Sequence, residues 1–116
     1  MIVKIADLVI RKLKEVVKDK YEIRYKEKIW KGLYACSVRL VKNDIPVVWF
    51  DWFETYDRKI AKNDWILIIP NALQVGKLIT WDEIEKLSIL ANEINEELGI
   101  WYPKKIIRNG EIIRLD

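Results

Sequence analysis

The apolar positions at the start of the chain recur with the period of an α-helix. In residues 2–19 they are three or four positions apart, at Ile2, Ile5, Ala6, Val9, Leu13, Val16 and Val17. This spacing places them on one side of a helix, and charged residues such as Lys4, Arg11 and Lys18 occupy the other side. The pattern therefore predicts an amphipathic helix over residues 2–19.

Strict alternation of apolar and charged residues follows, which is typical of β-strands. Tyr21, Ile23, Tyr25 and Ile29 share one side of a first strand, with charged residues between them. Residues 33–41 and 45–56 predict two further strands that meet across the turn at residues 42–44. Residues 65–69 are apolar on both sides, and we therefore expect this fourth strand to be central in its sheet.

The last third of the chain has clear start and stop signals. Thr80 and Glu83 have the spacing of a helix capping box, and Gly99 follows the last apolar position of that helix. Its expected buried stripe consists of Ile84, Leu87, Ala91, Ile94 and Leu98. Asn109-Gly110 then predicts a final hairpin. The element order is α-β-β-β-β-α-β-β, which predicts a single α+β domain over residues 1–116, with an antiparallel sheet of about five to six strands packed on the two helices.

The third predicted strand carries an aspartate, Asp51, between aromatic residues, and two registers are open for it. A two-residue loop before this strand would direct Asp51 into the core with Val47, Trp49 and Phe53. A three-residue loop would instead bury Val48, Phe50 and Trp52. Burying an unpaired carboxylate costs several kcal/mol, which is comparable with the stability of a whole domain. We therefore expect the three-residue loop, with Asp51 on the side away from the core.

That second side of the sheet has two interpretations. One helix could pack on each side of the sheet, with Asp51 near an edge and paired with Arg39. Alternatively, the second side could be an interface with another copy of the chain or with another molecule. The residues of this predicted interface are Val47, Trp49, Asp51, Phe53 and Arg39.

Several chemistries are excluded by composition. The chain has no histidine and one cysteine, Cys36, so neither a Ser-His-Asp triad nor a Cys-His pair can form within it. Its four glycines are scattered, and no phosphate-binding loop is present. We therefore expect no enzymatic activity and no cofactor.

The amino-acid composition also suggests a cellular compartment and a kind of source organism. A lone cysteine is typical of the cytoplasm, or of the host cytoplasm if the protein is viral. The chain is rich in Ile, Lys and Glu, and Gln74 is its only glutamine, which is typical of a hyperthermophile or of an archaeal virus that infects one.

Positive charge is concentrated in the N-terminal third of the chain. Residues 1–32 contain ten Lys or Arg against five Asp or Glu, whereas residues 66–99 contain two against six. In the basic segment, cations alternate with rings, a composition that suits DNA or RNA. An ordinary amphipathic strand also explains this alternation, because its tyrosines would face inward. The candidate nucleic-acid-binding residues are Arg24, Lys26, Lys28, Trp30 and Lys31.

A third hypothesis rests on acidic residues. Glu15, Asp44 and the run Asp57-Arg58-Lys59 follow one another in an order that resembles the PD-(D/E)xK nucleases. The resemblance implies carboxylates that hold magnesium and a lysine that assists the attacking water. The chain departs from that pattern, because residues 45–56 form one predicted strand where the family has a hairpin. We therefore expect a non-enzymatic binding protein, with nucleic acid as the first candidate partner, a homodimer as the alternative and a magnesium-dependent nuclease as the second alternative.

Overall fold

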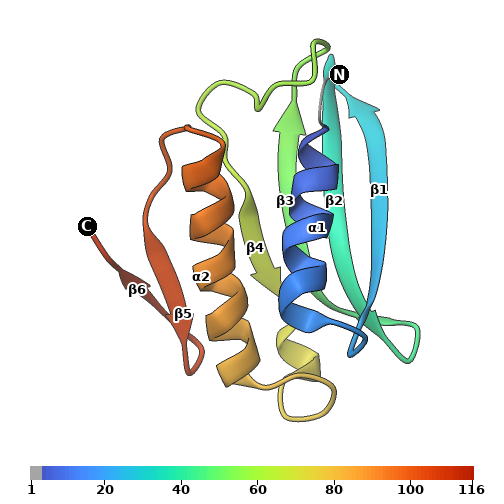
Figure 1. The fold of residues 1–116 in the computed structure, drawn as a ribbon, viewed down its shortest axis with the longest axis vertical. Coiled ribbons are helices and arrows are strands. Elements are labelled where there is room, and N and C mark those ends of the chain that lie inside the picture. The colour runs from blue at the N-terminus through green and yellow to red at the C-terminus, as the bar shows by residue number, and fades with distance from the viewer. Residues whose placement is uncertain (1–3) are drawn as a thin grey trace.

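The computed structural model describes residues 4–116 and contains two α-helices and six strands (Figure 1). In chain order the elements are α1 (Ile5–Val17), β1 (Glu22–Trp30), β2 (Leu33–Lys42), β3 (Ile45–Glu54), β4 (Leu67–Pro70), the short 3-10 helix η1 (Ala72–Gln74), α2 (Trp81–Glu97), β5 (Lys105–Arg108) and β6 (Glu111–Arg114). The predicted α+β class and element order are confirmed.

The strands form two sheets. β1 to β4 make an antiparallel sheet in sequence order, and β5 and β6 form a separate hairpin beside α2 (Figure 1). Polar side chains of α2 form hydrogen bonds with the backbone of Ile66, just before β4, and with that of Ile107 in β5. Asn95 bonds to both the amide and the carbonyl of Ile66, at 2.8 and 3.1 Å, and the Ser88 hydroxyl accepts from the Ile107 amide at 3.0 Å. Side chains of α2 thus satisfy backbone groups that a continuous sheet would have paired.

The expectation that the fourth strand is central was wrong, because β4 is the edge strand of the larger sheet. Its two sides are nevertheless both in contact with apolar groups. Ile68 packs against the core, while Leu67 and Ile69 lie on the other side, opposite Asp51 and Trp49 of β3. The second side of β4 is apolar because it lies beside the aromatic residues of β3, and not because β4 lies between two other strands.

The turn between β2 and β3 contains two residues, and the predicted three-residue loop was wrong. Asn43 and Asp44 both have positive φ, 53° and 61°, as a type I′ turn requires. A β-bulge between Leu40 and Val41 then shifts the pairing by one residue. Beyond it Val38 pairs with Phe50, so the predicted facing of Asp51 away from the core is confirmed.

The same bulge corrects the prediction for Val47. Because a bulge adds one residue to a strand, it interrupts the alternation of sides. Val47 and Val48 are both fully buried in the core cluster. Val47 therefore belongs to the core and not to the predicted interface.

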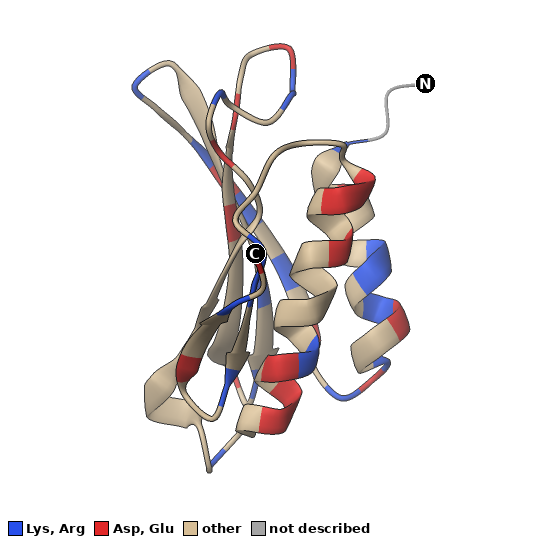
Figure 2. Ribbon diagram, turned by 90° about the vertical axis from the view of Figure 1, so that its left-hand side faces the viewer, with Lys and Arg blue, Asp and Glu red and all other residues tan. Residues whose placement is uncertain are grey.

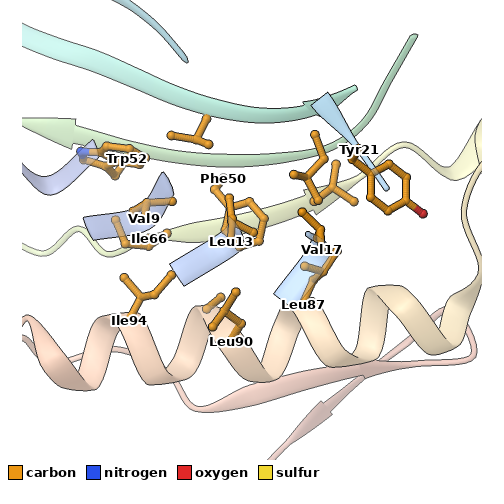
Figure 3. Packing of buried hydrophobic residues seen from close by; sticks show 14 of the residues in the cluster. Val9, Leu13, Val17, Tyr21, Phe50, Trp52, Ile66, Leu87, Leu90 and Ile94 are labelled. Atoms are coloured by element: carbon orange, nitrogen blue, oxygen red, sulfur yellow. The ribbon is translucent and has the colours of Figure 1, made fainter. Parts of the chain in front are cut away.

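Both α-helices cover the same side of the four-stranded sheet (Figure 2). Leu13 of α1 and Ile94 of α2 meet Phe50 and Trp52 of β3 in the core between the layers (Figure 3). The arrangement with one helix on each side is therefore ruled out. Within residues 4–116, no helix is long and apolar enough to cross a membrane.

The local signals of the C-terminal third are confirmed. Thr80 and Glu83 form both hydrogen bonds of the capping box at the start of α2. After the helix, Gly99 has a φ of 68°, in the left-handed region that glycine adopts without strain. Asn109 and Gly110, with φ of 49° and 81°, form the turn between β5 and β6.

Candidate functional site

The side of the four-stranded sheet away from the helices carries three rows of side chains, and we call this surface the open face. Strand pairing sets the rows as Arg24–Arg39–Trp49–Ile69, Lys26–Ser37–Asp51–Leu67 and Lys28–Ala35–Phe53. Most members are half-buried or exposed, while their neighbours in sequence face the core. Alternation along three paired strands thus builds one continuous mixed surface.

Two predicted groups of residues meet on the open face. Arg24, Lys26 and Lys28 of the predicted nucleic-acid-binding set lie on β1, and Trp49 and Phe53 of the predicted interface lie on β3, with β2 between them. The sequence presented these groups as rival hypotheses. In the fold they are parts of one surface.

The open face is hollowed by a cavity of about 530 Å³. Ala35 and Ser37, two small residues of the middle strand β2, line it, together with the larger Trp49 and Phe53 of β3. Small residues flanked by large ones leave a depression in a sheet surface. A planar group has space to lie there beside a ring.

Trp30 and Lys31 extend the open face at the end of β1. Trp30 remains 47% exposed, and its ring lies 5.6 Å from that of Phe53, centroid to centroid. The Lys31 ammonium lies 4.7 Å from the Trp30 ring centroid, within range of a cation–π contact. An exposed ring, a half-buried ring and a cation thus lie together beside the cavity.

Most cations of the open face lack acidic partners. Among residues 4–116, no ion pair involves Lys26, Lys28, Lys31 or Arg39. Arg24 differs, because its guanidinium contacts Glu22 at 2.8 Å and Asp44 at 2.9 Å. Four positive charges therefore remain available for an anionic ligand.

The expected ion pair between Arg39 and Asp51 is not formed. Asp51 Oδ1, Arg39 Nε and Ser37 Oγ are all shielded from solvent, and none has a hydrogen-bond partner in the part of the chain that the structure describes. Buried polar atoms are normally bonded, since leaving one unpaired costs about 1–3 kcal/mol. All three residues line the cavity.

A second polar cluster lies on the core side, around a glutamate that the sequence analysis did not single out. Glu54 is 2% exposed and accepts hydrogen bonds from Trp52 Nε1 at 2.5 Å and from Arg58 Nε at 2.7 Å. Arg58 also binds Glu27, and this hydrogen bonding lowers the pKa of Glu27 to about 2. Arg58 forms ion pairs with both Glu54 and Glu27, so these charged groups already have partners within the protein. We therefore infer that the cluster is structural and holds the segment after β3 against the sheet.

Cys36 belongs to the same core region. Burial is the largest effect on its thiol and raises its pKa to about 12. At neutral pH the side chain is therefore a thiol and not a nucleophilic thiolate.

The carboxylates of the nuclease hypothesis are not brought together. Asp44 lies in the turn before β3 and Asp57 in the segment after it, at opposite ends of that ten-residue strand (Figure 1). A strand of this length spans about 30 Å, far beyond the reach of one metal ion. No cluster of three or more acidic or cysteine side chains with metal-binding geometry occurs within residues 4–116.

No protein-family model, curated protein or solved structure matches this chain. The candidate site therefore rests on its own geometry.

Three contributors to the open face, Ser37, Leu67 and Ile69, were not predicted from the sequence. Ser37 lies opposite Asp51 on the open face but carries neither a charge nor a ring that would mark it as a site residue, and Leu67 and Ile69 belong to the segment expected to be a central strand. The available signal was the run Ala35, Ser37, Arg39, which puts small and polar side chains on the side away from the core.

Proposed function

We propose that this protein is a non-enzymatic binding protein for single-stranded nucleic acid, which it holds on the open face. The observation that supports this most strongly is the combination of unpaired cations with accessible rings on one surface. Lys26, Lys28 and Arg39 supply charge without acidic partners, and Trp30, Trp49 and Phe53 supply rings. Phosphates require the first and unpaired bases require the second.

A single strand fits this surface better than a duplex does. Bases in a duplex are stacked on one another, so their faces cannot reach the rings of Trp49 or Phe53. A flexible single strand can place its phosphates near Lys26 and Lys28 and a base in the cavity beside β3. We therefore expect single-stranded DNA or RNA to bind more tightly than duplexes of the same sequence.

The test is fluorescence anisotropy with labelled single-stranded DNA, single-stranded RNA and duplex probes. With three or four phosphates neutralised, affinity for a single strand should fall roughly 20- to 50-fold between about 50 and 200 mM salt. The double variant Lys26→Glu/Lys28→Glu should weaken binding of every sequence.

The matched control is Lys14→Glu/Lys86→Glu, which makes the same change of charge at exposed positions of α1 and α2. These helices cover the other side of the sheet, so binding should change much less. No binding at low salt, or an equal loss in both double variants, would refute the proposal.

Self-association through the open face is the second candidate function. It is favoured by the apolar side chains of Trp49, Phe53 and Leu67, which a lone domain leaves partly exposed. It is opposed by charge, because a two-fold interface brings the same surface of each copy together and would place Lys26 and Lys28 near their own equivalents. Light scattering across a range of concentrations decides between these outcomes. A dimer that dissociates on Trp49→Ala and does not bind oligonucleotides would support self-association.

A further inference from the structure

The three unpartnered polar atoms of the open face lie close together in the fold. Ser37 and Asp51 are directly opposite each other on β2 and β3, and Arg39 is two positions along β2 on the same side. Each contributes a shielded atom without a partner in residues 4–116, and each lines the cavity. Among the other buried and half-buried residues of that range, no shielded side-chain nitrogen or oxygen lacks a partner. The unmet hydrogen-bonding capacity is thus concentrated at one place.

The kinds of atom define what a ligand must supply. An ionised Asp51 can only accept hydrogen bonds, Arg39 can only donate them, and Ser37 can do either. The ligand must therefore present donors to Asp51, next to an acceptor that Arg39 or Ser37 can bind. It must also be flat, because Trp49 and Phe53 lie two positions before and after Asp51 on the same side of β3.

We propose that the cavity recognises the Watson–Crick edge of guanine, an inference that rests on the proposed function. That edge carries two neighbouring donors, the N1 and N2 hydrogens, beside one acceptor, O6. The two donors match the two oxygens of the Asp51 carboxylate, and O6 matches a donor from Arg39 or Ser37. The face of the base stacks on Trp49 or Phe53.

The other bases match this arrangement less well. Adenine and cytosine each offer the carboxylate a single amino group beside acceptors, and uracil and thymine offer one N–H between two acceptors. An acceptor placed against a carboxylate oxygen is repelled. Only guanine satisfies both carboxylate oxygens at once.

The position of Asp51 within a basic surface supports recognition of a base. For phosphate binding alone, a negative charge beside Lys26 and Arg39 lowers affinity by repulsion. A carboxylate that accepts from a base instead contributes sequence preference, since phosphate contacts carry none.

The first experiment uses the unmodified protein and uracil-rich single strands of roughly 12 nucleotides with two internal test positions. The test positions contain guanine, inosine, adenine or cytosine, and two isolated guanines avoid self-association of guanine-rich strands. Inosine is the sharpest probe because it lacks only the N2 amino group. We expect the guanine strand to bind roughly 5- to 150-fold more tightly than the adenine strand, and at least about fivefold more tightly than the inosine strand.

The second experiment compares Asp51→Asn with Glu22→Gln. Both remove one negative charge from a residue on the same side of the sheet, but Glu22 lies at the far end of β1, paired with Arg24. Asp51→Asn should abolish the difference between guanine and inosine while the plain uracil strand binds as well or better. Glu22→Gln should keep the guanine preference.

The outcomes separate this inference from the proposed function. Equal binding of all four strands would overturn guanine recognition and leave single-strand binding intact, whereas no binding of any strand at low salt would overturn both. A guanine preference that survives Asp51→Asn would overturn the role given to Asp51. The guanine–inosine comparison needs no variant, so it remains decisive if Asp51→Asn fails to fold.

Discussion

Trp49 and Trp52 are three positions apart on β3, yet their rings lie on opposite sides of the sheet. Trp52 is 2% exposed and packs within the core, whereas Trp49 is half-buried on the open face. Trp52→Ala should therefore lower the free energy of unfolding by about 3–5 kcal/mol, as expected for a large buried ring. Trp49→Ala should lower it less but weaken single-strand binding by about 1–3 kcal/mol through lost stacking.

Urea denaturation and anisotropy on both variants measure the two effects. Phe50→Leu is a matched control, because it alters a fully buried ring of the same strand without touching the open face. If Trp49→Ala were the more destabilising variant and left binding unchanged, the assignment of sides to functions would be wrong.

We expect substitution of Asp51 to affect stability less than substitution of Trp52. No ion pair or hydrogen bond within residues 4–116 depends on the Asp51 carboxylate. Asp51→Asn should not lower the free energy of unfolding by more than about 1 kcal/mol and could raise it, because the substitution removes no hydrogen bond or ion pair and takes a charge away from a shielded, unpartnered oxygen. Thermal unfolding followed by circular dichroism measures the change. A loss of several kcal/mol would show that the carboxylate supports the fold itself.

The reactivity of the buried Cys36 thiol reports on how often the core opens. Because burial raises the pKa of its thiol to about 12, reaction with a thiol reagent at neutral pH requires the protein to open. The native protein should react orders of magnitude more slowly than the urea-unfolded chain, and Trp52→Ala should accelerate the reaction. Rapid labelling of the native protein would contradict the burial of Cys36 beside Glu54.

At the scale of elements, α2 depends on its first turn. The Thr80 hydroxyl accepts from the Glu83 amide, and the Glu83 side chain accepts from the Thr80 amide. Thr80→Ala should therefore cost about 1 kcal/mol, measured by urea denaturation. Thr80→Ser is the control, because it keeps the hydroxyl and should retain most of the stability. Equal losses in both variants would mean that the cap is not what Thr80 contributes.

Local sequence signals predicted the helices, strands and turns, but they did not predict every detail of how the strands pair. The capping box and the Asn109-Gly110 turn act within a few residues, so their outcome could be predicted from the chain alone. The sides of β3 could also be predicted, because directing Asp51 to the core would bury a charge. The bulge that buries Val47 could not, since a two-residue turn plus a bulge directs Phe50 and Trp52 to the core just as a three-residue loop would, although the strand pairing differs by two residues.

The position of whole elements was harder to predict from sequence. Residues 65–69 are apolar on both sides, which is typical of a central strand, but the second side of β4 meets the aromatic surface of β3. The helical periodicity of α1 and α2 likewise shows that each helix has a buried face without showing which side of the sheet that face meets. The open face exists because both helices pack on the same side of the sheet. Which side they cover depends on packing across the whole core.

At the scale of the molecule, the most acidic element, α2, lies on the other side of the sheet from the open face. The acidic residues of the segment 66–99 lie mainly on α2, while the unpaired cations of the candidate site lie on β1 and β2 of the sheet (Figure 2). A net charge of +3 therefore understates the positive field of the open face. An anionic chain that approaches the protein is attracted to the sheet and repelled by α2, which favours binding in one orientation.

The response of the whole fold to acid follows from the cluster around Arg58. Hydrogen bonds from Arg58, and a further one from Tyr25, lower the pKa of Glu27 from 4.5 to about 2. The folded protein thus binds a proton at Glu27 less readily than the unfolded chain does. This contribution to stability is complete above about pH 4.5 and is lost as the pH falls towards 2. Urea denaturation at about pH 6 and about pH 3 should show a smaller acid-induced loss for Glu27→Gln than for the unmodified protein.

Glu111→Gln is the matched control for Glu27, because Glu111 is exposed and forms no ion pair among the described residues. It should keep the acid-induced loss of the unmodified protein. Glu27 lies on the core side of β1, whereas Lys26 and Lys28 beside it in sequence lie on the open face. Glu27→Gln should therefore alter the pH dependence of unfolding while leaving the affinity for single strands at neutral pH unchanged. A parallel loss of both properties would mean that the Arg58 cluster and the open face act as one site and not as two.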